Sequence, residues 1–377
     1  MTSQKLVRLS DVCQQDRTSV KAGQRAELAY RGLESIESNT GRYNEAGLSK
    51  TPEVPLANSF RFGPEHVLYG KLRPYLNKVA LAEFEGKCST EIIPLLPSPD
   101  LDRRFLAYFL RSPRTVSRIS EKTAGARMPR ADMDFIFSLE LVLPSLTEQR
   151  RIVDLLSRAE GIVRLRRDAQ RKAAELIPAI FVNMFGDPAT NPKGWPKARF
   201  GEYLRIQSSV RAPDIEREGD VPCVGADSIE SGTGQIVSWP TVADVQPISG
   251  KYGFCLGDVL YSKIRPALRK VVIAPSDGYC SADMYPLRVG EVATREYVHA
   301  LLLSNAFTEH AVGVSMRAQM PKVNRETLFA YSHPLPPIAL QRVFSERAKE
   351  IFALQEGQHH ALGVAKAAFG ALLSKAI

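Results

Sequence analysis

The chain contains one sequence unit twice, and the two copies lie 192 residues apart. The segment HVLYGKLRPYLNKV at 66–79 matches DVLYSKIRPALRKV at 258–271, and nine of the thirteen positions from Val67 to Val79 are identical. The same offset pairs Cys88 and Ser89 with Cys280 and Ser281, Met128 and Pro129 with Met320 and Pro321, and Gln149 and Arg150 with Gln341 and Arg342. About eighty residues therefore align without an insertion, and chance does not hold register over that length.

The duplication extends toward the start of each copy, where the register changes by one residue. GLESIESNTG at 32–41 corresponds to GADSIESGTG at 225–234, which indicates a change of loop length between the two motifs. The period is far longer than the roughly 20–50 residues of a solenoid repeat, so each copy is expected to be a domain with its own core. A length of 377 residues suits two modules of about 150 residues with connecting elements.

Each copy ends in a long helical pattern. After Pro144, apolar residues recur at alternating three- and four-residue steps, which is typical of a coiled-coil seam. They are Ile152, Leu155, Leu156, Ala159, Ile162, Val163, Leu165, Ala169, Ala173, Leu176, Ile180 and Met184. Ser145 with Glu148, or Thr147 alone, is expected to cap the start, Pro178 to kink the last turns and Gly186 to end the helix. About 38 residues at a rise of 1.5 Å give roughly 57 Å.

A second long helix is expected from Ile338 to the C-terminus, with the same periodicity. Two amphipathic helices of matched length cover their apolar stripes most simply against each other. The alternative is that each helix packs back on its own domain. An antiparallel pair would separate the two domains and relate them by a pseudo-twofold axis, which is also the symmetry of duplex DNA.

We therefore expect an α+β fold in which two similar globular domains are separated by two long antiparallel coiled-coil helices, a dumbbell. The expected segments are a first domain at 1–144, a first helix at 145–186, a second domain at 187–336 and a second helix at 337–377.

Composition places the chain among ordinary globular proteins, with 44% hydrophobic and 24% charged residues. No stretch approaches 18 apolar residues and the first residues lack an apolar signal core, so we expect a cytoplasmic protein with no membrane partner. Five scattered cysteines without a CxxC pair indicate free thiols and no metal site. The net charge of +9 attracts polyanions and weakly favours nucleic acid.

These motifs resemble the specificity subunit of type I restriction-modification systems, over the whole chain. The most specific part is LPSLTEQRRIVDLLSRAEGIVRLRRDAQRKAAELIPAIFVNMFGDPATNPKGWP at 143–196, and the pattern LYxKxRP…CSxE/D, present twice, agrees with it. The second helix departs somewhat, because it opens LPPIALQRVF and lacks the acidic residue of the first helix cap.

The resemblance implies a protein without catalytic residues or a cofactor of its own. It implies recognition of a two-part target in double-stranded DNA, with one half-site per target-recognition domain. It also implies that the helices bind two methyltransferase subunits and, in a larger complex, restriction-translocase subunits. S-adenosylmethionine, ATP and Mg²⁺ would belong to those partners.

Candidate DNA contacts follow the repeated strand motif. On a strand, Tyr69, Lys71 and Arg73 would alternate onto one face, and Tyr261, Lys263 and Arg265 would do the same. Further cations follow at Lys78, Arg269 and Lys270. These side chains suit phosphate contacts, which fix register without reading sequence. The alternative is a structural ion pair, since the repeat also keeps an acid, Glu91 in one copy and Asp283 in the other.

Base reading is expected where the two copies differ. Within ARMPR (126–130) and AQMPK (318–322), Arg127 stands opposite Gln319, and arginine suits guanine whereas glutamine suits adenine in the major groove. Arg130 and Lys322 would then contact the DNA backbone. The alternative is a solvent-facing loop with incidental variation. The divergent loops near 14–28, 42–60, 206–221 and 235–252 are further candidates, without a choice of residues.

Parts of the sequence also suggest three alternatives to DNA recognition. Glu65 and the Glu85-Gly86-Lys87 segment resemble an acidic nuclease pattern, but the second copy has Gly257 and Asp277-Gly278-Tyr279 instead. Asn191-Pro192 begins like an adenine-methyltransferase motif but lacks the aromatic residue that would stack a flipped base, and no GxxxxGK[ST] loop exists for ATP. A coiled-coil interaction scaffold that does not bind DNA would share the expected architecture.

Overall fold

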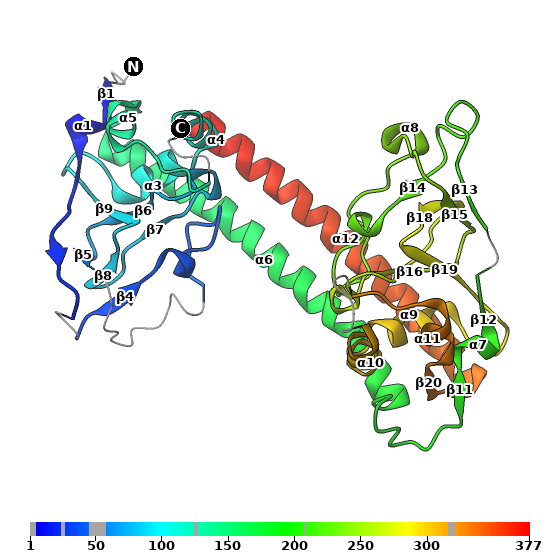
Figure 1. Cartoon of the computed structure of the whole chain (residues 1–377). Helices are drawn as coiled ribbons and strands as arrows, with labels where there is room; N and C mark the ends of the chain where they lie inside the picture. Colours follow the sequence, from blue (N-terminus) through cyan, green and yellow to red (C-terminus); the bar gives the residue numbers. More distant parts are fainter. Residues whose placement is uncertain (1–4, 24–26, 45–57, 124–126, 207–208, 316–320) are drawn as a thin grey trace. The chain divides into compact units, whose positions relative to one another are not determined.

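A computed structural model of the chain describes residues 5–23, 27–44, 58–123, 127–206, 209–315 and 321–377. They form two compact units, which we treat separately (Figure 1). The first unit comprises Met1–Arg166 with Leu362–Ile377, and the second comprises Arg167–Ala361. Each unit therefore contains a part of both long helices.

The first unit contains three small sheets. β1 (Lys5–Arg8) pairs with β10 (Glu140–Leu143). One four-stranded sheet has the order β2 (Cys13–Gln15), β9 (Ile92–Pro97), β6 (Val67–Gly70), β7 (Val79–Leu81). The other has the order β3 (Ser19–Val20), β5 (Ser59–Phe62), β8 (Gly86–Ser89), β4 (Ala29–Arg31), in which only β4 and β8 are parallel.

Short helices surround these sheets in the first unit, and one long helix follows them. They are α1 (Leu9–Val12), η1 (Leu33–Ser35), η2 (Pro74–Leu76), α3 (Arg103–Arg111), α4 (Pro113–Glu121), α5 (Met133–Ser138) and α6 (Leu146–Phe185).

The second unit repeats the three sheets in the same strand order. β11 (Lys197–Arg199) pairs with β20 (Ser332–Pro334). One sheet has the order β12 (Leu204–Arg205), β19 (Met284–Val289), β16 (Val259–Ser262), β17 (Val271–Ile273). The other has the order β13 (Val210–Arg211), β15 (Lys251–Phe254), β18 (Gly278–Ser281), β14 (Cys223–Val224).

The helices of the second unit include, in the same order, a counterpart of each described helix of the first, and α8 falls at positions equivalent to residues outside the described ones. They are α7 (Phe200–Tyr203), η3 (Ala226–Ser228), α8 (Val242–Val245), η4 (Pro266–Leu268), α9 (Arg295–Leu303), α10 (Asn305–Ser315), α11 (Arg325–Ala330) and α12 (Ile338–Ala376). The duplication that the sequence predicts is thus confirmed in the topology, and the mixed helix and strand content confirms the α+β class.

The repeated VLY strand is buried on both faces, which explains why its sequence is an unbroken apolar run. In the first unit, Tyr69 of β6 lies in the larger core, beneath α3, while Leu68 lies in a smaller core on the opposite face. In the second unit, Tyr261 and Leu260 of β16 divide in the same way. The strongest sequence identity between the copies therefore marks the centre of each core.

Both long helices begin and end close to the residues that the sequence predicts. The backbone N–H of Glu148 donates to the hydroxyl of Ser145 at 3.4 Å, so Ser145 caps α6 and Thr147 lies inside the helix. Gly186 ends the helix with a left-handed φ of 83°. No helix among the described residues is long and apolar enough to cross a lipid bilayer.

The buried seam of α6 has a seven-residue spacing, and the same spacing recurs in α12 at the 192-residue offset. Its buried members are Gln149, Leu156, Val163, Ile177 and Met184 in α6, and Gln341, Ala348, Gln355 and Leu362 in α12. The broader stripe expected from the sequence was partly wrong, because Leu155, Ile162, Leu165 and Leu176 are exposed. Val153, Ala173 and Phe181 are buried beside this seam, so the core-facing side of α6 is wider than one stripe, and the four exposed residues lie outside it.

Within each unit, the helix segments pack both against each other and against the sheet domain. In the first unit, Leu373 of α12 shares a core with Leu156 of α6 and with α3. In the second unit, the Phe344 ring of α12 lies 5.8 Å from the Phe181 ring of α6, and Gln355 donates to the Ala173 carbonyl at 2.9 Å. Helix pairing and helix–domain packing therefore occur together instead of excluding each other.

Candidate nucleic-acid interface

The LYxKxRP motif forms a strand followed by a tight turn. β6 ends at Gly70, and the next residues place Arg73 (φ 51°) and Asn77 (φ 49°) in the left-handed region on either side of η2. In the second unit, Arg265 (φ 48°) and Arg269 (φ 48°) flank η4 in the same way. A left-handed residue with a side chain costs about 1 kcal/mol or more, and such residues cluster at functional sites.

Two of the predicted DNA contacts are corrected by this geometry. Tyr69 is 4% exposed and Tyr261 is 1% exposed, and burial raises the pKa of both phenols. The expected alternation onto one strand face is wrong, because the strand stops before Lys71 and the tyrosines point into the core. Both tyrosines support the sheet and present no surface to a DNA partner.

Backbone hydrogen bonds join this turn to the second predicted contact segment, which lies more than fifty residues further along the chain. The N–H of Arg73 donates to the Pro129 carbonyl at 2.7 Å, and the N–H of Ala131 donates to the Lys71 carbonyl at 2.8 Å. Leu72 forms a bridge with Arg130.

The second unit has the same connections. The N–H of Arg265 donates to the Pro321 carbonyl at 2.9 Å, and the N–H of Val323 donates to the Lys263 carbonyl at 2.9 Å. Ile264 forms a bridge with Lys322. We call 71–77 with 127–130, and 263–269 with 321–322, the paired loops. The structure thus brings together the two groups of cations that the sequence proposed separately.

Glu91, the acid that the repeat keeps in the first unit, forms an ion pair with Arg130 and not with a cation of the strand motif. The Arg130 guanidinium binds Glu91, with Nη2 to Oε1 at 2.9 Å, and this carboxylate raises the pKa of Arg130. Arg130 remains exposed, so its ion pair is open to solvent. Lys71 is half-buried.

The side chain of Lys263 in the second unit is buried and bonded within its own domain. It is 8% exposed, its ammonium donates to the Ala282 carbonyl and lies 5.0 Å from the Tyr285 ring centroid. Burial and the nearby Lys322 lower its pKa. A phosphate contact from this side chain would require it to leave these partners.

Lys78 and Lys270 hold the loops that carry the SIES motif. The Lys78 ammonium donates to the Leu33 carbonyl at 2.8 Å, and Lys270 donates to the Ala226 carbonyl at 2.8 Å. Burial lowers the pKa of Lys78. Both lysines therefore connect the turn of their own unit to the loop that carries the SIES motif.

Arg73 and Arg265 have a different environment, because both are exposed at the paired loops. Neither guanidinium has a hydrogen bond or ion pair among the described residues. Arg127 is exposed as well, whereas Gln319 lies outside the described residues, so their comparison remains a prediction. Arg73, Arg265 and Arg127 are the candidates that the structure leaves most accessible.

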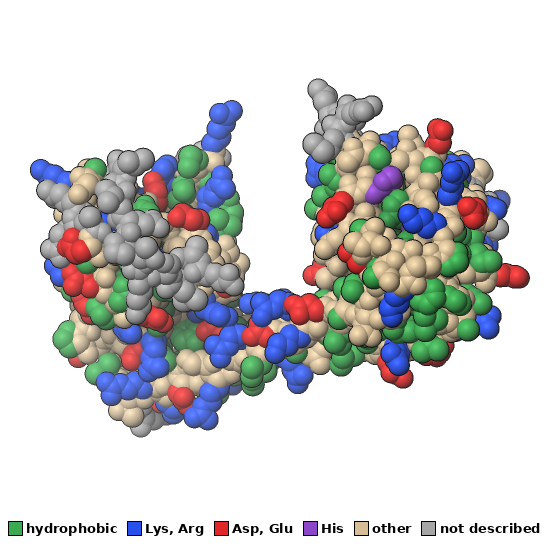
Figure 2. All heavy atoms as spheres, turned by 90° about the horizontal axis from the view of Figure 1, so that it is seen from below, with side chains coloured by type: hydrophobic (Ala, Val, Ile, Leu, Met, Phe, Trp, Pro, Cys, Tyr) green, Lys and Arg blue, Asp and Glu red, His purple; other side chains and the backbone are tan. Residues whose placement is uncertain are grey.

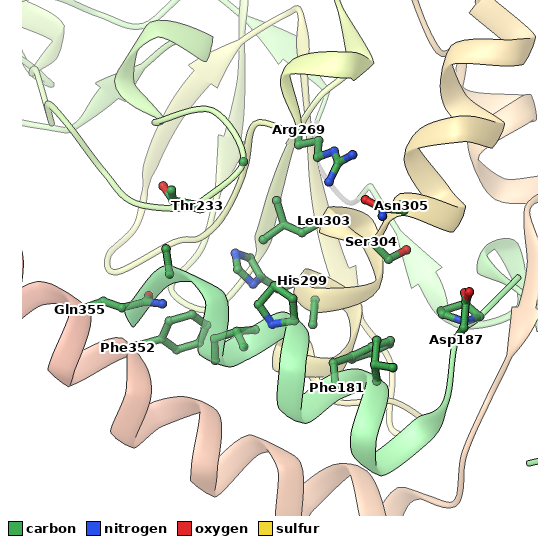
Figure 3. A pocket seen from close by; sticks show the side chains of 17 residues that line it. Phe181, Asp187, Thr233, Arg269, His299, Leu303, Ser304, Asn305, Phe352 and Gln355 are labelled. Carbon is green, nitrogen blue, oxygen red and sulfur yellow. The ribbon is translucent and has the colours of Figure 1, made fainter. Parts of the chain in front are cut away.

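Arg269, at the other end of the turn from Arg265, lines a cavity of about 230 Å³ in the second unit (Figure 3). Thr233, His299 and Ser304 also line it. In the first unit, the position equivalent to Leu303 of this cavity is Arg111, which is 7% exposed and pairs with Glu160.

Asn77 extends the Arg111–Glu160 pair to the turn, because its amide donates to the Arg111 carbonyl at 3.2 Å. The turn in the first unit is therefore linked to α6 through one chain of contacts. Sequence reasoning missed this connection, although an arginine at the end of the apolar run FLAYFL of α3 was a signal for it.

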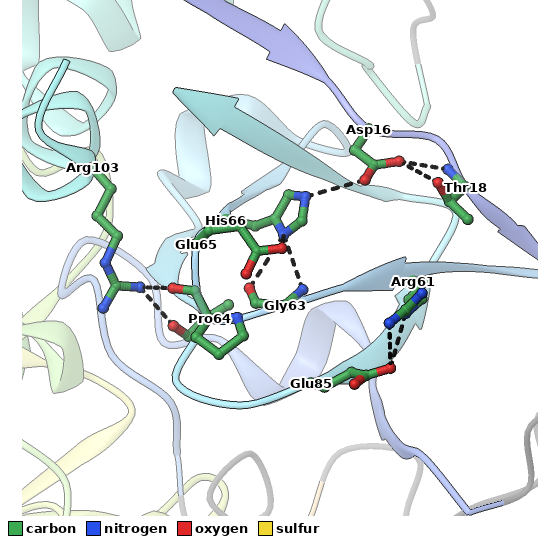
Figure 4. Close-up of polar contacts among 10 residues, drawn as sticks. Asp16, Thr18, Arg61, Gly63, Pro64, Glu65, His66, Glu85 and Arg103 are labelled. Atoms are coloured by element: carbon green, nitrogen blue, oxygen red, sulfur yellow. Dashed lines mark hydrogen bonds and ion pairs between the residues drawn. The ribbon is translucent and has the colours of Figure 1, made fainter. Parts of the chain in front are cut away.

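The residues of the nuclease-like pattern have separate structural partners (Figure 4). Glu85 pairs with Arg61 at 2.7 Å, while Glu65 lies 3.2 Å from the ring of His66. Lys87 is fully buried. Within the described part of the chain, no three His, Cys, Asp or Glu side chains gather as a metal site.

Gln149 and Gln341 are a second feature that sequence reasoning missed. The buried Gln149 amide donates to the carbonyls of Asp100 and Pro144 at 2.8 and 2.9 Å, and its oxygen accepts from the Asp102 N–H at 2.8 Å. Gln341 makes the equivalent bonds in the second unit. The paired QR motif was a signal for this anchor between the helix and the domain.

Comparison with known proteins agrees with this arrangement. Residues 4–174 match the family model described as the type I restriction modification DNA specificity domain. The chain is 27% identical over 378 residues to the type I restriction enzyme EcoDI specificity subunit from Escherichia coli, covering 90% of this chain and 82% of that protein. It is 24% identical over 280 residues to the MjaVIII specificity subunit from Methanocaldococcus jannaschii, covering 68% and 65%.

Two solved structures share the fold. One comes from a study of complex assembly and conformational transition of the type I R-M system, with a TM-score of 0.57 and 20% identity over 100% of this chain and 98% of that one. The other is a type I restriction-modification S subunit from M. genitalium, with a TM-score of 0.57 and 13% identity over 100% and 96%. The chain is therefore similar over nearly its whole length to type I restriction-modification specificity subunits, and residues 4–174 match the DNA specificity domain of that family.

Proposed function

We propose that this specificity subunit, which catalyses no reaction itself, reads a two-part target in double-stranded DNA, with one half-site for each set of paired loops. The observation that carries the proposal is the exposed arginine held at the same strained turn in both units, Arg73 and Arg265. A duplicated domain that presents the same cation twice suits two similar backbone contacts on one duplex.

Arg73 and Arg265 are proposed to bind phosphates, with Arg130, Lys322 and Lys71 nearby. Neutralised phosphates release counterions, so each contact adds about 0.9 to the slope of log K against log salt. Such contacts position the domain without reading sequence. The buried tyrosines and the solvent-shielded Lys263, Lys78 and Lys270 would act indirectly by holding the turn.

Base reading is proposed for the residues that differ between the two sets of paired loops. Arg127 is exposed and suits a bidentate contact with guanine, whereas Gln319 suits adenine. Replacing Arg127 by Gln is expected to change the preferred base in one half-site only. Unchanged preferences in both half-sites, with binding intact, would remove Arg127 from this role.

We further propose that α6 and α12 pair antiparallel along their whole length, so that the domains at 1–144 and 187–336 lie at opposite ends as in a dumbbell. The matching seven-residue seams, Gln149 to Met184 and Gln341 to Leu362, support this pairing. A helix of roughly 57 Å would place the half-site centres less than about 17 base pairs apart, at about 3.4 Å per pair.

The exposed faces of the helices are proposed to bind two methyltransferase subunits and, in the larger complex, restriction-translocase subunits. In the first unit, Leu155, Ile162 and Leu165 expose apolar side chains on α6. Arg164 and Arg166 of α6 are exposed as well, and Figure 2 shows many Lys and Arg side chains on the surface of the molecule. An apolar stripe with a charged rim is typical of a protein interface. S-adenosylmethionine, ATP and Mg²⁺ would be bound by these partners.

Long-read methylation mapping of a host that expresses the chain with its methyltransferase tests the proposal. We expect a two-part motif, modified on both strands and separated by unread base pairs. A continuous short palindrome would contradict the bipartite reading. Gel shifts on random duplexes, with and without the methyltransferase, test the scaffold alternative, since a scaffold selects no motif.

A further inference from the structure

Tyr75 occupies the tip of the turn in the first unit. It is the middle residue of η2, between the buried Pro74 and the half-buried Leu76, and 53% of its surface is exposed. An exposed tyrosine on a well-packed domain loses apolar burial that a core position would provide. Its exposure therefore raises the question of what the ring contacts.

The backbone beneath Tyr75 is fixed from several sides. The N–H of Leu76 donates to the Arg73 carbonyl at 2.9 Å and the N–H of Asn77 donates to the Pro74 carbonyl at 2.9 Å. These two bonds close the turn. The Asn77 carbonyl accepts from the N–H of Asn39 at 3.2 Å. Together with the bond from Arg73 to Pro129, these contacts hold the ring on a rigid support.

The second unit builds the same turn with a different tip. Ala267 replaces Tyr75, while the left-handed residues and the closing bonds are kept, with Leu268 to Arg265 at 2.9 Å and Arg269 to Pro266 at 3.0 Å. The chain thus carries one frame with two different exposed tips, an aromatic ring in one unit and a methyl group in the other.

The other differences between the two turns are less suited to reading DNA. Leu72 corresponds to Ile264, a change between similar side chains that are both half-buried. Asn77 corresponds to Arg269, but Asn77 is half-buried and donates to the Arg111 carbonyl. Tyr75 is thus the exposed side chain at which the two frames differ most in size and chemistry.

We propose that Tyr75 contacts a base in the half-site read by the first unit, and gives that half-site a preference that the second half-site lacks at the equivalent position. The inference rests on the proposed DNA-reading function. A phosphate held by Arg73 would bring the duplex to the base of the turn, two residues from the ring. A tyrosine ring there packs on a thymine methyl group or wedges against a base step, and its hydroxyl donates to a base edge. The Ala267 methyl group is too short for these contacts.

The test uses the assembled complex with its methyltransferase and a library of target sites, read out by methylation. Replacing Tyr75 by Ala is expected to reduce the preference at one position of one half-site by about 10- to 100-fold, the effect of losing one base contact. The other half-site keeps its preference. Tyr75→Phe separates the hydroxyl from the ring, and Val292→Ala, an exposed apolar residue outside the paired loops, is the matched control.

The reciprocal variant Ala267→Tyr is expected to add or change a preference in the other half-site. Unchanged preferences for Tyr75→Ala would overturn the inference, as would a uniform loss of methylation over all sequences, which indicates a positioning role. If the unmodified complex itself selects no two-part motif, the proposed function fails instead. The unfolding midpoint of each variant checks the fold, which a surface side chain is expected to leave unchanged.

Discussion

Arg111 of α3 and Glu160 of α6 form an ion pair inside the first unit, with the guanidinium 7% exposed. Tyr108 donates a second hydrogen bond to the same carboxylate at 2.9 Å. At the equivalent positions, the second unit has Leu303 and Phe352, which pack at its core. The same junction between helix and domain is thus held by charge in one unit and by apolar packing in the other.

Removing one member of this pair is expected to destabilise the first unit. Arg111→Leu leaves the Glu160 carboxylate without its guanidinium partner, and breaking such a partly buried pair costs about 2–4 kcal/mol once the exposure of Glu160 is considered. The double variant Arg111→Leu with Glu160→Phe, which copies the second unit, is expected to recover much of this loss. Urea unfolding of the full chain measures it, and a double variant no more stable than Arg111→Leu would contradict the argument.

The glutamines at the helix starts make a second prediction. Gln149→Ala removes three hydrogen bonds at a fully buried position and leaves two carbonyls and one N–H without their partner. The expected cost is about 1–3 kcal/mol, and Gln341→Ala is expected to cost a similar amount. The neighbouring exposed Arg150→Ala is the control. Equal unfolding midpoints for Gln149→Ala and Arg150→Ala would show that the anchor is dispensable.

The sequence predicted the duplicated topology and both long helices. A repeated sequence gives a repeated domain, and the period of the apolar residues follows the buried face of a helix. The sequence did not predict the turn at Arg73. Arginine rarely adopts a left-handed φ, and the contacts that hold Arg73 there include a hydrogen bond to Pro129, which is distant in the chain. A strand reading of LYxKxR was therefore natural, and it placed the buried Tyr69 on the wrong surface.

The helix seam shows a related limit. Leu155 and Leu156 both fit the three- and four-residue steps, and only the packing of α3 and α12 in the first unit decides that Leu156 is buried. Tyr75 was not predicted as a contact for another reason: the LYxKxRP segment is nearly identical in the two copies and therefore indicates a constant frame, whereas ARMPR and AQMPK differ visibly.

Acid is expected to destabilise the second unit first. Burial lowers the pKa of His299 and of His333 to about 4, and also lowers that of His310, and all three belong to this unit. These histidines are neutral when folded, whereas in the unfolded chain they bind protons below about pH 6.5. Their contribution to stability is thus complete above pH 6.5 and is lost as the pH falls toward 4.

The measurement is the unfolding free energy at several pH values between 7 and 4, for the full chain and for His299→Ala. The equivalent residue in the first unit is Ala107, so alanine is compatible with this position of the fold. Each strongly shifted histidine steepens the curve by roughly 1.4 kcal/mol per pH unit. The variant is less stable at neutral pH but is expected to have a shallower slope. A slope equal to that of the unmodified chain would exclude His299 as the cause.

The exposed arginines of the two turns are expected to change the salt dependence of DNA binding. Arg73→Ala removes a cation that has no ion-pair partner among the described residues, so folding is little affected. If Arg73 binds one phosphate, the slope of log K against log salt falls by about 0.9, and binding weakens equally for all sequences. Arg265→Ala is expected to have the same effect, and the double variant is expected to add the two effects.

Lys78→Met is the contrasting variant, because the Lys78 ammonium that it removes is bonded to the Leu33 carbonyl. It is expected to lower stability and keep the slope. Titrations of the assembled complex at several salt concentrations distinguish these outcomes, and an unchanged slope for a normally folded Arg73→Ala would rule out the phosphate contact.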